Sequence, residues 1–278
     1  MTFTIEFWEF FLVTFLLAIC LSTQTLLMAG CSLVLLILTG YVLICRPAFY
    51  QQSRYYIGFA LVLLIYPILS DFIVPTLPPH RFDTTLLNLS NTLFPWLNFQ
   101  HITHTYWLTE VLSLCYSLTL FIDVVAFLYF LVYKENTLCA QMQFTWYIAF
   151  TCYILLPVEG PHSLGVIPDW STFGPLTKFN QLFAKAITGT IDCFPSMHTC
   201  SILQWLLFVK RYGSTGLFWA LLPFSLLVVL STLYLNYHYA MDVVCGAALA
   251  FGTHWYMKRY PLSFKFSLSL PKKTNQLC

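Results

Sequence analysis

The sequence predicts an all-helical, polytopic membrane protein. Hydrophobic residues make up 59% of its 278 residues, charged residues make up only 9%, and the mean hydropathy is +0.74. Soluble globular proteins carry roughly 25% charged residues, so this chain has too few to cover a water-facing surface. Apolar stretches of about 20 residues, the length of a membrane-spanning helix, recur along the chain. The net charge of +2 gives no electrostatic reason to expect a nucleic-acid partner.

Eight segments are predicted to span the membrane, at roughly 6–22, 25–45, 55–75, 109–133, 143–158, 198–212, 214–234 and 238–257. We interpret the last six as a core and the first two as extra N-terminal spans. A cleaved signal peptide is the alternative for the first segment, but Glu6 and Glu9 without a Lys or Arg fit it poorly. The expected domains are a transmembrane extension (1–50), a catalytic membrane domain (51–260) and a tail (261–278).

The Lys and Arg residues indicate an orientation. With eight spans, ten of the 13 fall on one side and only Arg81, Lys178 and Lys185 on the other. Basic residues accumulate in cytoplasmic loops, so both termini are expected in the cytoplasm. The loops near 76–108, 159–197 and 235–238 then face the periplasm, the cell exterior or an organelle lumen. In the first of these loops, LLNLSNTLFPWLNF is expected to form a short interfacial helix.

Most of the ten cysteines lie in or beside apolar runs, where they behave as small hydrophobic residues. The sequence contains no C-x-x-C pair, so it predicts no disulfide framework and leaves the redox compartment open. Cys193 is the exception, because it lies in a polar loop and has no obvious partner in the sequence.

Two segments carry the chemistry. FPSMHT (194–199) lies at the outer start of the sixth predicted span, and STLYLNYHYAMD (231–242) joins the seventh to the eighth. His238 and Asp242 are four residues apart and share one helix face. An ionisable residue inside a span is costly, which makes Asp242 a functional candidate.

These residue types suit nucleophilic catalysis of phosphoryl transfer. A carboxylate on one imidazole nitrogen fixes the tautomer and leaves the other nitrogen free to attack, so His238 is the expected nucleophile and Asp242 its partner. His198 begins a helix on the same side and can protonate the leaving group. Ser196 and the backbone N–H groups of 196–199 can hold an anion at the helix N-terminus.

The pattern P-S-x-H followed by S-x6-H-x3-D resembles the type 2 phosphatidic acid phosphatase superfamily of lipid phosphatases and phosphotransferases. The resemblance covers about residues 150–257 and, by topology, the six spans from 55 onward. It implies a six-helix core, a phosphohistidine at His238, orientation by Asp242, and His198 as acid and then base. It also implies that Ser231 and Tyr239 contact the substrate, and that no metal or other cofactor is needed.

Two departures bear on the substrate. The superfamily's K-x6-R-P motif is missing, since 155–162 read LLPVEGPH, and Thr232 stands where an Arg is usual. Those cations would bind a dianionic phosphomonoester, whereas a phosphodiester carries a single negative charge. The motif shape is similar to the inositol phosphorylceramide and sphingomyelin synthase branch, in which an aspartate corresponds to Asp192. That branch often has a basic residue shortly before the nucleophile, where this chain has Asn236 and Tyr237.

The sequence therefore favours a lipid phosphotransferase with a membrane phospholipid as donor and a lipid alcohol, such as ceramide or diacylglycerol, as acceptor. One alternative is a lipid phosphate or polyprenyl diphosphate phosphatase that uses water. The other is a non-enzymatic transporter or inactive relative. Zinc on His198, His238 and Asp242 is an alternative by ligand chemistry alone, as is a metal on His101 and His104 rather than an interfacial polar face. The head group, the acceptor and the oligomeric state stay open.

Overall fold

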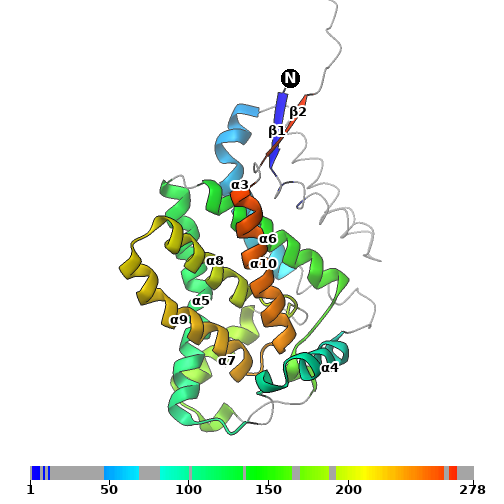
Figure 1. Cartoon of the computed structure of the whole chain (residues 1–278), viewed down its shortest axis with the longest axis vertical. Coiled ribbons are helices and arrows are strands. Elements are labelled where there is room, and N and C mark those ends of the chain that lie inside the picture. Colours follow the sequence, from blue (N-terminus) through cyan, green and yellow to red (C-terminus); the bar gives the residue numbers. More distant parts are fainter. Residues whose placement is uncertain are drawn as a thin grey trace, which may run out of the picture.

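The computed structural model describes residues 2–6, 9, 12, 47–68, 82–99, 102–133, 136–164, 170–187, 192–259 and 263–267. The described part is a bundle of helices with one small sheet beside it (Figure 1). Predicted spans 6–22 and 25–45 fall almost entirely outside the described residues. Glu9, at the start of that stretch, forms a buried ion pair with Arg54, with Oε2 and Nη2 2.6 Å apart.

Six long helices correspond to the last six predicted spans. They are α3 (Pro47–Ile68), α5 (Tyr106–Tyr133), α6 (Asn136–Leu155), α8 (Met197–Tyr212), α9 (Thr215–Tyr234) and α10 (Ala240–Arg259). By length and apolar composition, two stretches within the described part are able to cross a membrane, Tyr106–Ala126 and Thr215–Tyr234. The helical class is therefore confirmed for the bundle, while six membrane-crossing helices and two extra spans stay predictions.

A two-stranded antiparallel sheet was not expected. Strand β1 (Thr2–Glu6) pairs with β2 (Ser263–Ser267), from Thr2 opposite Ser267 to Glu6 opposite Ser263. Both strands are short segments of alternating polar and apolar residues at the margins of the predicted spans. Each forms a strand by pairing with the other. The expected tail after 261 therefore begins with a strand that pairs with the N-terminal segment.

Shorter helices gather at the end of the bundle opposite this sheet (Figure 1). They are α4 (Asp83–Leu93), α7 (Pro175–Ile187) and the 3₁₀ turns η3 (Pro95–Leu97), η4 (Pro161–Leu164) and η5 (Trp170–Thr172). The expected interfacial helix corresponds to α4 and η3, where Trp96 is 72% exposed. Helix α7 was not predicted; it too presents apolar residues outward, with Leu182 70% exposed.

Buried polar contacts fix these short elements. The Glu110 carboxylate on α5 accepts hydrogen bonds from the backbone N–H groups of Leu176 and Thr177, at 3.0 and 3.1 Å, which caps the N-terminus of α7. The Asp83 carboxylate accepts from the backbone N–H groups of Glu159 and Gly160, at 3.2 and 2.8 Å. Asp83 thereby ties the start of α4 to the loop that follows α6.

Close packing of α8 against α10 prepares the site. At Gly246 an added Cβ would collide with the Ser196 carbonyl oxygen, so only glycine lets the helix backbone approach the loop this closely. The Ser196 N–H also donates to the Asp242 carbonyl oxygen, at 3.1 Å. The start of α8 is therefore held directly against the first turn of α10.

Candidate active site

His238 lies in a tight turn between α9 and α10. The backbone N–H groups of Tyr237 and His238 both donate to the Thr232 carbonyl oxygen, at 3.1 and 3.0 Å. Asn236 has a φ of 57°, in the left-handed region that asparagine tolerates better than most residues. The turn places the His238 side chain, only 6% exposed, against the loop that precedes α8.

The hydrogen bond of the imidazole defines its tautomer. His238 Nδ1 lies 3.0 Å from the Cys193 carbonyl oxygen, and because a carbonyl can only accept, Nδ1 carries the proton. Nε2 then has a free lone pair. The Asp242 carboxylate oxygen Oδ2 is 3.7 Å from Nδ1, close enough to act as a charge but beyond hydrogen-bond length. The backbone carbonyl, rather than the expected carboxylate, thus makes the bond that selects the tautomer.

Asp242 is fully buried and is anchored by other groups. Its Oδ2 accepts from the Tyr239 N–H at 2.8 Å and from the Cys193 thiol at 2.9 Å. Burial, reinforced by the negative charge of Asp242, raises the pKa of the Cys193 thiol well above its ordinary value. The thiol therefore stays protonated and donates to the carboxylate. Sequence reasoning missed this role of Cys193, although its place in a polar loop five residues before His198 was an available signal.

The ligand atoms of Cys193, His238 and Asp242 lie within 4.8 Å of one another, close enough to hold a metal ion. The zinc alternative named His198 in place of Cys193, so the structure assembles a different set. In this structure the thiol and Nδ1 bond to protein acceptors instead. His101 lies outside the described residues, and His104 Nε2 bonds the Tyr234 carbonyl oxygen at 2.8 Å.

His198 faces His238 from the first turn of α8. The two ring centres are 6.1 Å apart, with the rings tilted by 59°. His198 stacks on Tyr116 of α5 at 4.0 Å, and Tyr116 in turn stacks with Tyr237 at 4.5 Å. This stack orients the His198 ring. An imidazole from α8 and an imidazole from the turn before α10 are thus close enough to reach one phosphoryl group.

The remaining expected site residues have mixed surroundings. The Ser196 hydroxyl caps α8 by accepting from the Thr199 N–H at 3.3 Å, and the Ser231 hydroxyl donates to the Val228 carbonyl within α9 at 2.6 Å. Both serines therefore bond within or at the end of their own helices, and their contact with a substrate stays a prediction.

The other two expected substrate-binding residues bond to side chains from distant elements. Asp192 accepts a hydrogen bond from the Tyr66 hydroxyl. The Tyr239 hydroxyl donates to Asp83 at 3.1 Å. Their contact with a substrate also stays a prediction.

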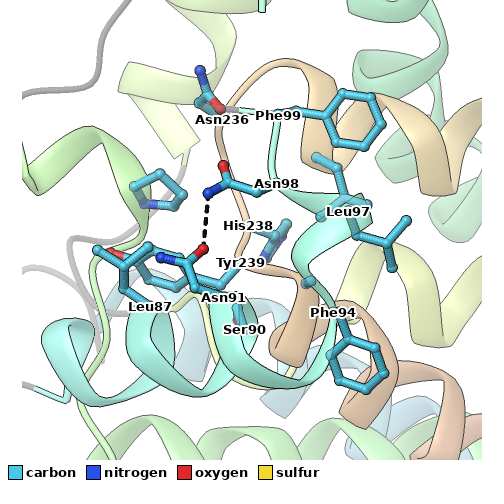
Figure 2. A pocket seen from close by; sticks show the side chains of 13 residues that line it. Leu87, Ser90, Asn91, Phe94, Leu97, Asn98, Phe99, Asn236, His238 and Tyr239 are labelled. Atoms are coloured by element: carbon cyan, nitrogen blue, oxygen red, sulfur yellow. Dashed lines mark hydrogen bonds between the residues drawn. The ribbon is translucent and has the colours of Figure 1, made fainter. Parts of the chain in front are cut away.

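A pocket adjoins His238 (Figure 2). One wall comes from α4 and η3, and the other from the turn between α9 and α10. Its lining residues are Leu87, Ser90, Asn91, Phe94, Leu97, Asn98, Phe99, Pro161, Leu233, Asn236, His238, Tyr239 and Ala240. No Asp, Glu, Lys or Arg lines this pocket in the described part of the chain.

Cationic groups near the site are few. Arg81 lies outside the described residues, and Lys178 is exposed on α7. His162, on η4, interacts electrostatically with Asp192 and Asp83; although the residue is largely exposed, desolvation of its ring lowers its pKa. The described residues therefore supply little fixed positive charge for a phosphate dianion.

Comparison with known families agrees with the motif resemblance. The family model described as the PAP2 superfamily matches residues 90–256, which is more than half of the chain and includes His198, His238 and Asp242. The chain belongs to the PAP2 superfamily, and at that level it is a phosphatase-type protein. The comparison with curated proteins found no match, and neither did the comparison with solved structures. The superfamily prediction is confirmed, while the synthase branch stays a prediction.

Proposed function

We propose that this protein is an integral membrane lipid phosphotransferase. It moves a phospho-head group from a phospholipid to a lipid alcohol through a phosphohistidine at His238. The observation that carries this proposal is the hydrogen bond from His238 Nδ1 to the Cys193 carbonyl, which leaves Nε2 free to attack, with His198 6.1 Å away between ring centres.

The first half-reaction forms a covalent intermediate. His238 Nε2 attacks the phosphorus atom of the donor, the bond from phosphorus to the diacylglycerol oxygen breaks, and protonated His198 gives its proton to that oxygen. The imidazole of His238 becomes positively charged. The Cys193 carbonyl and the Asp242 carboxylate, 3.7 Å from Nδ1, stabilise this charge.

The second half-reaction reverses the roles. Neutral His198 removes the proton from the acceptor hydroxyl, whose oxygen attacks phosphorus while the bond between phosphorus and Nε2 breaks. His238 returns to its starting tautomer and His198 to its protonated form. Proton and phosphoryl group are both conserved over the cycle, so no metal or redox partner enters the balance.

The charges around the pocket favour a phosphodiester donor. Its described lining contains no Lys or Arg, and a diester phosphate carries one negative charge instead of two. Hydrogen-bond donors and a helix N-terminus suffice to stabilise a single charge better than a double one. A lipid phosphate or diphosphate would lack its usual cationic partners here.

The placement in a membrane belongs to the same proposal. The two candidate spans, the apolar outward residues of α4 and α7, and the excess of Lys and Arg in the other loops support it. We place both termini in the cytoplasm and the site at the opposite surface, facing the periplasm, the exterior or an organelle lumen.

The test uses the full chain in vesicles that contain a phospholipid labelled in its head group, with and without ceramide. With diacylglycerol as acceptor, the label is placed on the diacylglycerol instead, because the product has the same structure as the donor. We expect a labelled lipid product only when the acceptor is present, and loss of that product in His238→Ala. His254→Ala is the matched control, because His254 lies fourteen residues beyond Ala240, the first residue of α10, which is about 21 Å along the helix. Release of phosphate or of a phosphorylated head group, without acceptor product, would assign the protein as a phosphatase instead. Absence of turnover with every donor would favour a non-enzymatic relative.

A further inference from the structure

Three asparagines follow one another along one side of the pocket beside His238 (Figure 2). Asn91 comes from α4, Asn98 follows η3, and Asn236 belongs to the turn between α9 and α10. Asn98 Nδ2 donates to Asn91 Oδ1 at 2.8 Å, so the first two form a connected pair at the exposed mouth. Carboxamides therefore line the pocket from its mouth to its buried end.

Asn236 is the unusual member of this row. It is only 3% exposed, and its Nδ2 has no hydrogen-bond partner among the described residues. A buried amide without a partner costs free energy. Its left-handed backbone, φ 57°, turns this side chain to the pocket two residues before the proposed nucleophile. An unpartnered buried donor in a pocket indicates that a ligand supplies the missing acceptor.

Apart from the proposed nucleophile His238, the side chains of Ser90 and Tyr239 are the other polar groups of the described lining, and both are already engaged. The Ser90 hydroxyl accepts from the Met241 N–H at 3.0 Å, and the Tyr239 hydroxyl donates to Asp83 at 3.1 Å. These bonds hold α4 against α10 and keep the pocket's width constant. Asn236 Nδ2 is thus the buried donor of the lining that is positioned to select a ligand.

Aromatic residues also line the pocket, but they do not form a cage for a cation. Phe94 and Phe99 pack with Leu233 and Ala240 in a hydrophobic cluster, and their rings point away from Asn91 and Asn98 in Figure 2. A quaternary ammonium group needs an aromatic face or an anion. The rings of Phe94 and Phe99 do not offer such a face beside Asn91 and Asn98, no Asp or Glu is in the described lining, and Tyr239 alone does not surround a cation.

We propose that this pocket binds an uncharged, hydroxyl-rich group and that Asn236 donates a hydrogen bond to it. Hydroxyls both donate and accept, as carboxamides do, so the two match at every position of the row. An ammonium group only donates and would leave the asparagine N–H groups without acceptors. This inference rests on the proposed function, since the group is carried either by the phosphodiester donor or by an acceptor alcohol.

The first arm of the test measures binding without turnover. The detergent-purified full chain is melted in the presence of the methyl ester of phosphoglycerol or the methyl ester of phosphocholine, two soluble phosphodiesters that share only the methyl phosphate half. We expect the phosphoglycerol ester to raise the melting temperature at concentrations where the phosphocholine ester does not. Asn236→Gly, which suits the left-handed backbone, and Asn91→Leu should remove the effect. Asn88→Leu, on the exposed face of the same helix α4, should keep it.

The second arm measures turnover and locates the source of the group. Vesicles contain phosphatidylglycerol or phosphatidylcholine as donor, with radiolabelled diacylglycerol as acceptor, so that transfer is measured as label that enters the phospholipid. If the donor carries the group, phosphatidylglycerol reacts about tenfold faster, the effect of one hydrogen bond to a buried group, and Asn236→Gly removes the preference. If the acceptor carries it, free glycerol takes the phosphocholine group from phosphatidylcholine to give glycerophosphocholine, and the same variant stops this reaction.

The two arms separate the inference from the function on which it rests. Selective binding without turnover of any donor would support the pocket's specificity and overturn the transferase. The inference would be overturned, and the transferase assignment kept, by a different result. Both diesters would bind equally, and turnover would be independent of the donor head group, would not use free glycerol and would be unchanged in Asn236→Gly.

Discussion

Replacing Asp242 with asparagine tests the charge beside the nucleophile. The amide oxygen can still accept from the Tyr239 N–H and the Cys193 thiol, which now bond Oδ2 at 2.8 and 2.9 Å. The Asp242→Asn variant is therefore expected to keep the fold and the position of the loop. What the variant removes is the negative charge 3.7 Å from His238 Nδ1.

The size of the effect follows from that distance. At an effective dielectric constant of about 20, two unit charges 3.7 Å apart interact by about 4 kcal/mol. The interaction is present in the phosphohistidine, where the imidazole is charged, and absent when the imidazole is neutral. Turnover is therefore expected to fall by about three orders of magnitude, at about 1.4 kcal/mol per factor of ten.

The assay compares initial rates of lipid product formation in vesicles for the wild type and Asp242→Asn. Asp123→Asn is the matched control: Asp123 accepts from Trp205 Nε1 at 2.8 Å, and Trp205 lies about two helical turns beyond His198 on α8. An asparagine there still accepts that bond, so its rate should be near that of the wild type. A folded Asp242→Asn protein with more than about a tenth of the wild-type rate would refute the electrostatic role of Asp242.

Three further perturbations separate the roles of neighbouring groups. His198→Gln should slow release of a lipid alcohol by about 10²–10⁴-fold, but it should slow release of p-nitrophenolate from a diester far less, because that leaving group needs no proton. Equal losses of rate for the two leaving groups would contradict the assignment of His198 as general acid. Gly246→Ala, whose Cβ meets the Ser196 carbonyl oxygen, should lower the free energy of unfolding by about 1–3 kcal/mol in denaturant melts. Gly252→Ala, with nothing within 4 Å of its Cβ, should be tolerated. Equal stability of the two variants would contradict the close approach of Gly246 to Ser196. Because the pKa of Cys193 is raised in the folded state, the protonated thiol contributes fully to stability below the ordinary thiol pKa, and this contribution is lost as the pH rises through the folded-state pKa. Alkylation of Cys193 by iodoacetamide at pH 8 should therefore be far slower in the folded than in the denatured protein. Equal rates would show that the thiol is not protected.

The sequence was sufficient to predict the long helices and the pair of histidines. Apolar runs of membrane-spanning length located α3, α5, α6, α8, α9 and α10, because hydrophobic length is a local property. The motif spacing predicted that His198 and His238 both begin helices on one side of the bundle. His198 does so in the first turn of α8, whereas His238 lies in the turn two residues before α10 and does not share a helix face with Asp242. The structure places their rings 6.1 Å apart.

The groups that orient these histidines lay beyond sequence reasoning. The bond to His238 comes from the backbone carbonyl of Cys193, an atom that every residue carries and no side-chain pattern reveals. Tyr116, which stacks on His198, belongs to α5 and is 82 residues away in the chain. Only tertiary packing brings α5 beside α8, so neither contact has a local signature.

Helix α7 and the sheet were missed for a related reason. Two buried polar side chains of α7 bond to α5: the Thr177 hydroxyl donates to Glu110, and Asn180 Oδ1 accepts from the Ser117 hydroxyl. The segment is therefore stabilised as a helix by a partner far away in the sequence. Strands β1 and β2 are likewise defined by each other across almost the whole chain. Pairing of this kind depends on long-range contacts rather than on local propensity.

The central claim is that His238 Nε2 forms a covalent bond to phosphorus. The most direct measurement is to mix the protein with a donor phospholipid labelled with ³²P, quench in alkaline detergent before an acceptor is added, and map the label by proteolysis. The account predicts a label on the peptide that contains His238, stable in base and lost in acid, absent in His238→Ala and chased into lipid product by diacylglycerol. Full turnover by His238→Ala, or a label on any other residue, would contradict it.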